Sequence, residues 1–312
     1  MVRTAVLTPE RLLRRLEWRV VRRLDGRLQG DYRTLFRGTG IDVADLREYE
    51  PGDDVRHVDW NVTARMDSLH VREYLEDREV TAWLLLDCSP SMEFGPVERH
   101  KHIVLSEITA IVAQLLARGG NRVGAVLFDT EIEQVIPPGH GRNQVLRILS
   151  HLMQAPSGTG STDAKGDRAP RAGPRRTTDL AAALRAALGV ARRRSLVVVI
   201  SDFITEPGWE RPLAQLAARH DVMAIQVRDR REFELPAAGM IYVEDAETGE
   251  QIFVDSDDPK FQQRLRMAAD ERQSAIWTAA KTAGTDLFSV NTDDDLVRAL
   301  IRISELRRRR RH

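Results

Sequence analysis

The sequence contains a single cysteine, Cys88, so it cannot form an internal disulfide. Proteins that depend on disulfides carry several cysteines and belong to oxidising compartments. We therefore expect a reducing compartment, and a cytoplasmic localisation is the default prediction. Cys88 follows a short apolar run, and we expect it to fill core space; a redox role is the less favoured alternative.

Long apolar runs are also missing. The longest charge-free stretch in the apolar helical segments, around residues 108–117, is about half of the roughly 18 residues that a membrane-spanning helix requires. The first 20 residues interrupt their apolar positions with Arg and Glu, which is not the pattern of a signal peptide. We therefore expect no membrane span.

The chain has no excess charge of either sign. It balances 47 Lys+Arg against 47 Asp+Glu, and only 5% of its residues are aromatic. This composition does not favour nucleic acid as a partner. Lysine occurs only at positions 101, 165, 260 and 281, so arginine supplies nearly all of the positive charge. The Arg clusters at 168–176 and 307–311 are therefore weak indications of function, and nucleic-acid binding is kept as a third hypothesis.

Several chemical signatures are absent as well. No Gly-x-x-x-x-Gly-Lys-Ser/Thr phosphate loop occurs, so we expect no ATP hydrolysis by the chain itself. The eight histidines show no paired metal-ligand spacing, which argues against zinc. No histidine stands where it would activate Ser89 or Ser91 as a nucleophile. We predict no catalytic residue.

From residue 80 onward, strand and helix signals alternate. Continuous apolar runs at 81–87 and 195–202 are typical of strands buried on both faces of a parallel sheet. The segments 122–129 and 131–137 are separated by almost no loop and predict a hairpin. Helices are predicted at 100–117, 143–153, 178–191, 209–219, 261–281 and 293–306. The pattern predicts an α/β fold, a doubly wound and mostly parallel sheet with helices on both faces.

Residues 1–79 are expected to form a smaller N-terminal region that packs against this sheet. Its first part, residues 9–28, has apolar residues at every fourth position and predicts an amphipathic helix. We favour a packed helix with a solvated arginine face over a helix that binds a membrane surface or a partner. An acidic segment follows at 41–79.

Residues 80–306 are expected to form the main domain. It contains a Gly/Pro/Ser/Arg-rich loop at 155–176, which we expect to be flexible, and an inserted β-ribbon at 229–259. Residues 307–312 are expected to form a solvated basic tail.

Side chains that offer oxygen gather at the predicted carboxyl ends of the strands. The first strand ends at Asp87 and continues to Ser89 and Ser91; a later helix begins near Thr178, and the most apolar strand ends at Asp202. Ligands of open parallel sheets bind at this edge. Two carboxylates and three hydroxyls suit a hard cation such as Mg²⁺ or Mn²⁺. The sequence therefore predicts a metal site made of these five residues.

The same residues carry a family resemblance. Asp-x-Ser-x-Ser after the first strand, Thr-Asp-Leu-x-x-Ala-Leu from Thr178, and an apolar strand that ends in Asp together resemble a von Willebrand factor A (VWA) domain with a metal-ion-dependent adhesion site. All five matching positions are present, but Arg175-Arg176-Thr177 replaces the usual Gly-Gly before the threonine. The resemblance implies that an acidic side chain of a partner completes the shell of the ion.

The upstream segments REYEPGDDVRHVDW (47–60) and LHVREY (69–74) resemble the signature of the bacterial "domain of unknown function 58" family. The similarity covers roughly residues 30–300. Such proteins are typically encoded beside MoxR-type AAA+ ATPases, so the resemblance implies a partner of that class.

From these observations we predict a non-enzymatic, Mg²⁺-dependent protein-interaction module. It would act as an adaptor between a MoxR-type AAA+ ATPase and an unidentified client protein that supplies an acidic ligand. The alternative from another class is a metal-dependent hydrolase or phosphotransferase that uses the same ion with Asp53, Asp54 and Asp59. We favour pairing of these acids with neighbouring arginines in a structural network.

Overall fold

The computed structural model describes residues 8–16, 46–51, 53, 55, 58, 60–66, 68–72, 80–95, 99–155, 177–236, 238–244 and 251–311. Residues 156–176 of the expected loop and residues 17–28 of the expected first helix lie outside the described residues.

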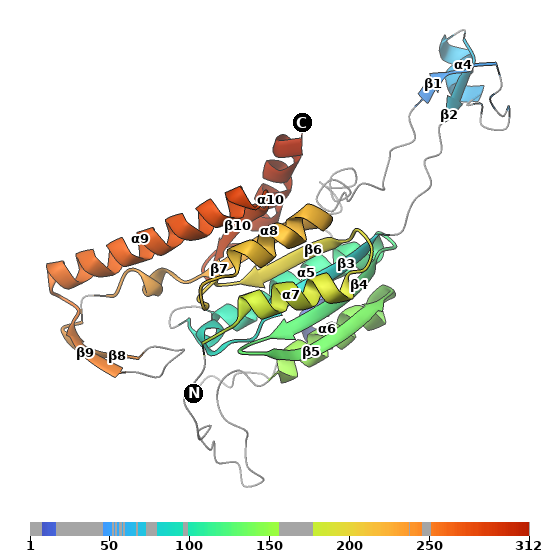
Figure 1. Cartoon of the computed structure of the whole chain (residues 1–312). Coiled ribbons are helices and arrows are strands. Elements are labelled where there is room, and N and C mark those ends of the chain that lie inside the picture. Colours follow the sequence, from blue (N-terminus) through green and yellow to red (C-terminus); the bar gives the residue numbers. More distant parts are fainter. Residues whose placement is uncertain are drawn as a thin grey trace.

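A six-stranded sheet forms the centre of the described chain, with the strand order β10-β7-β6-β3-β4-β5 (Figure 1). Its strands are β3 (Thr81–Asp87), β4 (Arg122–Phe128), β5 (Ile132–Gly139), β6 (Leu196–Ser201), β7 (Asp221–Arg228) and β10 (Asp286–Asn291). All neighbours are parallel except β4 and β5, which form an antiparallel hairpin. The predictions of a doubly wound, mostly parallel sheet and of a hairpin are therefore confirmed.

The apolar runs become central strands because both faces of the sheet are covered. In β3, Leu84 and Leu86 belong to one core cluster, whereas Trp83 and Leu85 belong to the other. Every residue of β6 is buried. Since successive side chains of a strand point to opposite faces, only a sheet with two covers can bury such a run.

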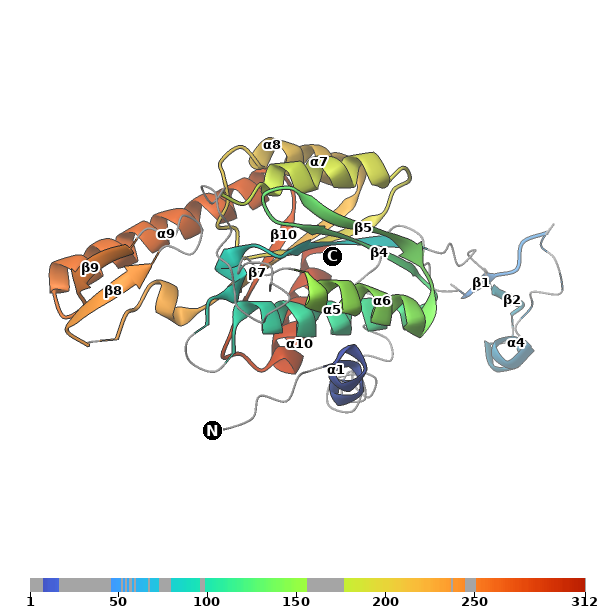
Figure 2. The ribbon, with the colours of Figure 1, turned by 90° about the horizontal axis from the view of Figure 1, so that it is seen from below.

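Helices form the two covers (Figure 2). One face carries α5 (Lys101–Arg118), α6 (Gly141–Gln154) and α10 (Leu296–Arg311), and the other carries α7 (Leu180–Val190), α8 (Glu210–Arg219) and α9 (Pro259–Thr282). Each of the six predicted helices is present, with ends that differ from the prediction by a few residues.

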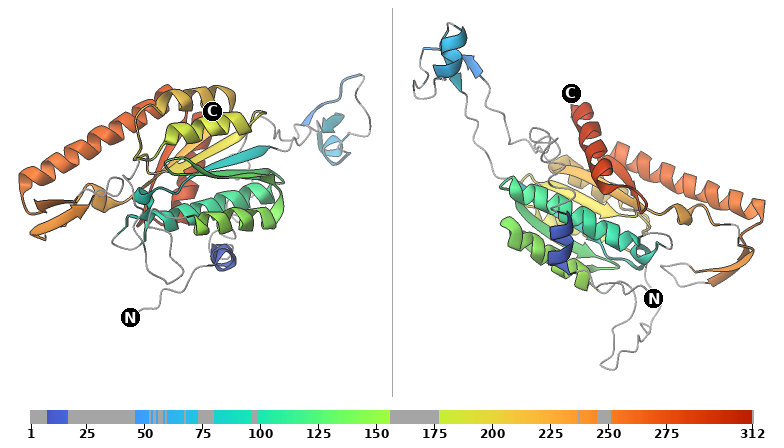
Figure 3. Two further views of the ribbon diagram at one scale, coloured as in Figure 1. Left: turned by 60° about the horizontal axis from the view of Figure 1, so that its bottom comes forward. Right: turned by 180° about the vertical axis from the view of Figure 1, so that it is seen from behind.

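The N-terminal helix α1 (Pro9–Leu16) lies outside α5 and α6 (Figure 3). Its Leu12, Leu13 and Leu16 are buried in the same core cluster as those helices. The described part of the first predicted helix is therefore packed through its apolar stripe, as its fourfold spacing indicates.

Two small units complete the described chain. β1 (Leu46–Glu48) pairs with β2 (His70–Arg72) beside α4 (Trp60–Met66), and β8 (Met240–Glu244) pairs with β9 (Gln251–Asp255). The β8–β9 hairpin is the predicted ribbon, and it extends beyond the sheet together with the first turns of α9 (Figure 1). Its turn, residues 245–250, lies outside the described residues.

The basic tail was predicted to begin at residue 307, but the last helix of the structure includes this residue. Arg307 belongs to α10, has no exposed surface, and makes ion pairs with Asp221 at 2.7 Å and Asp286 at 3.4 Å. These carboxylates begin β7 and β10, so Arg307 joins the last helix to two strands. The burial of Arg307 could not be predicted, because it begins a run of five arginines and composition alone does not distinguish a buried arginine from solvated neighbours.

We predict that Arg307→Met lowers the free energy of unfolding by about 2 kcal/mol, because two partly shielded carboxylates lose their partner. Urea denaturation measures this change. Arg302→Met, at an exposed position of the same helix, is the matched control and should change stability by less than about 0.5 kcal/mol. Equal effects of the two substitutions would contradict a structural role for Arg307.

Candidate metal site at the carboxyl edge of the sheet

The candidate site lies where the chain reverses its direction of travel across the sheet. β3 and β6 are adjacent and parallel, with Leu86 opposite Ile200. The next residues, Asp87 and Ser201, therefore end their strands at the same level. Such a reversal point leaves a crevice at the carboxyl ends of the strands, and ligands of doubly wound folds bind there.

Hydrogen bonds join the first half of the site. One oxygen of Asp87 accepts the Ser89 backbone N–H at 3.0 Å, and the other accepts the Ser201 hydroxyl at 2.5 Å. The hydroxyl oxygens of Ser89 and Ser91 lie 3.0 Å apart. The Asp-x-Ser-x-Ser segment thus folds into one tight cluster.

The second half comes from the loops that precede α7 and follow β6. Asp202 accepts the backbone N–H of Ile204 at 2.9 Å, and the carbonyl of Thr178 accepts the Thr205 hydroxyl at 2.6 Å. Phe203, which follows Asp202, has a φ of 63°. This left-handed conformation is uncommon for a bulky residue and is concentrated at functional sites.

The structure brings all five predicted residues to this one edge. Each is at most 3% exposed; they are Asp87, Ser89, Ser91, Thr178 and Asp202. Their donor atoms are all oxygens, which fits a hard divalent cation. Their role as metal ligands stays a prediction.

One residue of the site was missed by the sequence analysis. Lys101, the first residue of α5, is completely buried, and its ammonium donates to Asp202 at 2.6 Å and also to Glu232. Glu232 ends the short 3₁₀ helix η4 (Arg230–Glu232). The ring of Phe94 lies 5.8 Å from the ammonium. A signal was available, because lysine is rare in this arginine-rich chain.

The ammonium is a cation built into the site. Burial by itself lowers the pKa of Lys101, but the charges of Asp202 and Glu232 outweigh it and raise the pKa. Lys101 is therefore charged at neutral pH. It neutralises one oxygen of Asp202, so a metal ion that uses this oxygen has to displace the ammonium.

The pKa of Asp87 is raised to about 7, first by burial and then by the charge of Asp202, against the hydrogen bonds from Ser201 and Ser89 that lower it. A carboxyl group with this pKa is partly protonated at neutral pH. Metal binding has to release that proton.

Two further buried groups border the site. Asp129 directly follows β4 and Asp87 is the last residue of the adjacent β3, so the strand-end position of Asp129 was the signal for it. Gln226 in β7 donates to the carbonyl of Asp202 at 3.3 Å. Cys88 is buried too, and burial raises the pKa of its thiol, which agrees with its predicted place as a core filler.

The carboxylates of the alternative hydrolase hypothesis are only partly described. Asp53 accepts the backbone N–H of Glu50 at 2.9 Å and thereby closes a turn. Asp54 and Asp59 lie outside the described residues.

The raised pKa of Asp87 predicts how stability depends on pH without metal. The folded chain holds a proton that the unfolded chain releases above about pH 4, so this stabilising contribution is complete below pH 4 and is lost as pH rises through 7. We expect urea denaturation in EDTA to show a loss of ~2 kcal/mol between pH 5 and pH 8.

Asp87→Asn, which resembles the protonated acid, should reduce this pH dependence. Asp270→Asn, at an exposed position of α9, is the control and should keep it. An unchanged pH profile in Asp87→Asn would show that another group causes it.

None of the helices in the described residues combines the length and the apolar composition needed to cross a membrane.

The fold is similar to several solved structures at low identity. BatB from Bacteroides thetaiotaomicron is 16% identical, with a TM-score of 0.44, and the match covers 74% of this chain and 99% of that one. The VWA domain of SpRpn10 is 13% identical, with a TM-score of 0.37, and the match covers 72% of this chain and 94% of that one.

Sequence relatives are closer. Uncharacterized protein Rv1480 of Mycobacterium tuberculosis and uncharacterized protein Mb1516 of Mycobacterium bovis are each 37% identical over 300 residues, which is 95% of this chain and 89% of each relative. The model of the family described as "Protein of unknown function DUF58" matches residues 45–275. The match spans most of the chain, and we conclude that the chain belongs to this family.

Proposed function

We propose that the chain is a protein-interaction module whose edge site binds Mg²⁺ or Mn²⁺ in exchange for the Lys101 ammonium. The observation that carries this proposal is the buried cluster of oxygens around Asp87 and Asp202, in which the Lys101 ammonium contacts Asp202. A site that pairs carboxylates with an ammonium provides the negative charge that a divalent ion needs.

Exchange of the Lys101 ammonium for a metal ion would also affect residues outside the edge site. Lys101 also holds Glu232 in η4, and the chain continues from η4 to the β8–β9 hairpin. When a metal ion takes Asp202, the ammonium leaves that carboxylate and its contact with Glu232 changes as well. The state of the edge site is thereby linked to the base of the hairpin.

The hairpin offers a surface for a protein partner. Four large apolar side chains on it are at least 50% exposed: Met240, Tyr242, Ile252 and Phe253. The rings of Tyr242 and Phe253 contact each other with centroids 4.7 Å apart. Because Tyr242 pairs with Phe253 and Val243 pairs with Ile252, Met240, Tyr242 and Phe253 share one face of the hairpin, and Ile252 lies on the other. Exposed apolar side chains that share a face are typical of an interaction surface.

We propose a MoxR-type AAA+ ATPase as the partner, on the family resemblance, with a client protein that supplies an acidic ligand to the ion. A cytoplasmic location is part of the same proposal. The alternative hydrolase or phosphotransferase would show metal-dependent turnover of a substrate. No contact among the described residues favours that alternative.

Cation exchange predicts a specific effect of Lys101→Met. Without metal, this variant should lose about 3 kcal/mol of stability, because Asp202 and Glu232 lose their cation. Mg²⁺ should then raise its melting temperature more than that of the wild type, since no ammonium competes. Lys281→Met, at an exposed position of α9, is the control and should behave as the wild type does. If Mg²⁺ shifts neither protein, the edge does not bind the ion.

The interaction is tested by binding of the purified chain to the MoxR-type ATPase of the same host, measured by biolayer interferometry. We expect binding in Mg²⁺ that weakens at least tenfold in EDTA and in the double variant Ser89→Ala, Ser91→Ala. The double variant Ser150→Ala, Ser274→Ala removes two hydroxyls from other helices and should bind normally. Binding that ignores both metal and mutation would contradict the ion-dependent mechanism.

A further inference from the structure

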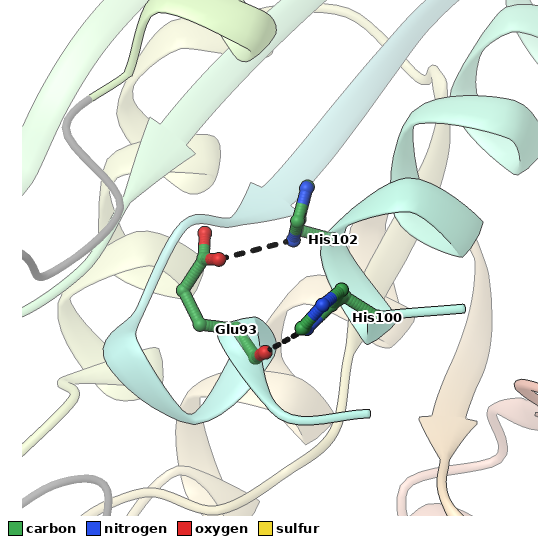
Figure 4. Close-up of side chains that lie close together, drawn as sticks. All are labelled: Glu93, His100 and His102. Carbon is green, nitrogen blue, oxygen red and sulfur yellow. Dashed lines mark hydrogen bonds and ion pairs between the residues drawn. The ribbon is translucent and has the colours of Figure 1, made fainter. Parts of the chain in front are cut away.

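A second cluster of metal-binding side chains lies beside the Asp-x-Ser-x-Ser loop. Glu93 ends the 3₁₀ helix η3 (Pro90–Glu93), His100 is the N-cap of α5, and His102 lies in its first turn (Figure 4). One ligand atom from each of the three side chains lies within 4.8 Å of the other two. None of these residues belongs to the edge site described above.

The spacing of two of these side chains matches a zinc site without rearrangement. Nδ1 of His102 lies 3.2 Å from a carboxylate oxygen of Glu93. Two ligands that are each about 2.05 Å from Zn²⁺ at a tetrahedral angle are about 3.3 Å apart. An ion can therefore be held between these two atoms, and His100, which has a ligand atom within 4.8 Å of theirs, is the third candidate ligand.

The hydrogen bonding of His100 prepares it as a ligand. Its Nδ1 lies 2.6 Å from the backbone carbonyl of Glu93. Because a carbonyl can only accept, Nδ1 carries a proton, and in the neutral ring Nε2 then keeps its lone pair for a metal ion. Metal-bound imidazoles are held in the same way, with the other ring nitrogen donating to a carbonyl or carboxylate.

Nδ1 of His102 adds an independent observation. It is enclosed, yet it makes no hydrogen bond within the described residues; its contact with Glu93 has the distance of an ion pair without hydrogen-bond geometry. Buried nitrogen atoms normally have a hydrogen-bond partner, and an exception needs an explanation. A metal ion bound between His102 and Glu93 would give this nitrogen a partner.

We propose that Glu93, His100 and His102 form a binding site for Zn²⁺ or a similar transition-metal ion, with at least one coordination position left open. Two imidazoles and one carboxylate suit zinc and not Mg²⁺, which prefers oxygen ligands. The sequence analysis did not single out these residues, because His100-x-His102 is not a usual paired spacing and Glu93 comes seven residues earlier.

The proposed zinc site lies next in sequence to residues of the edge site. Glu93 lies two residues after Ser91, and Lys101 lies between the two histidines. A bound ion therefore ties the loop that carries the serines to the helix end that carries the built-in ammonium. The inference does not rest on the proposed function, because it concerns other residues and another class of metal.

The test is isothermal titration calorimetry of the EDTA-stripped full chain with Zn²⁺ in the presence of excess Mg²⁺. We expect one equivalent to bind, and at least tenfold weaker binding in His102→Gln and in His100→Gln. His151→Gln in α6 is the matched control and should bind as the wild type does. Glu93→Gln is a second variant that leaves both imidazoles in place.

Two further measurements distinguish this site from the edge site. Co²⁺ substituted for Zn²⁺ should give the intense visible absorption of tetrahedral coordination, and the His102→Gln variant should lose it. The double variant Ser89→Ala, Ser91→Ala should keep zinc binding. The proposal is wrong if the wild type binds no stoichiometric zinc, or if binding survives unchanged in the histidine variants.

Discussion

The carboxyl edge of this protein is organised by one buried ammonium. Lys101 is the first residue of α5. Its ammonium contacts Asp202, which follows β6, and Glu232, which lies after β7. Taking an ammonium and two carboxylates out of water is costly, and it is compensated only when their geometry is good and the other polar atoms are bonded. The surrounding hydrogen bonds meet that condition, because Ile204 binds the second oxygen of Asp202 and Asp229 caps η4.

The same constraint explains why the edge is suited to binding. Asp87 and Asp202 end two neighbouring strands, so their negative charges are forced close together by the sheet and not by a local motif. Burial is the main reason that the pKa of Asp87 is raised, and the charge of the neighbouring Asp202 raises it further. The fold thus gathers buried carboxylates at this edge, and Lys101 joins one of them, Asp202, to Glu232 in η4.

Much of this could be predicted before the structure. Parallel strands buried on both faces need continuous apolar runs, and the runs at β3 and β6 identify the centre of the sheet. The residues after those strands then fall at the carboxyl edge, which is why the oxygen cluster was found. The role of Arg307 could not be predicted, because its partners Asp221 and Asp286 start strands far away along the chain.

The sequence by itself determined the class of fold, the order in which its elements alternate, and the five oxygen-bearing residues that converge on one edge. Apolar periodicity and strand-end position are local properties, so they are readable without coordinates. Only the tertiary structure decided that Lys101 sits on Asp202 and that Glu93 meets His100 and His102. Those contacts depend on the orientation of the first turn of α5, which is set by the packing of this helix against the sheet.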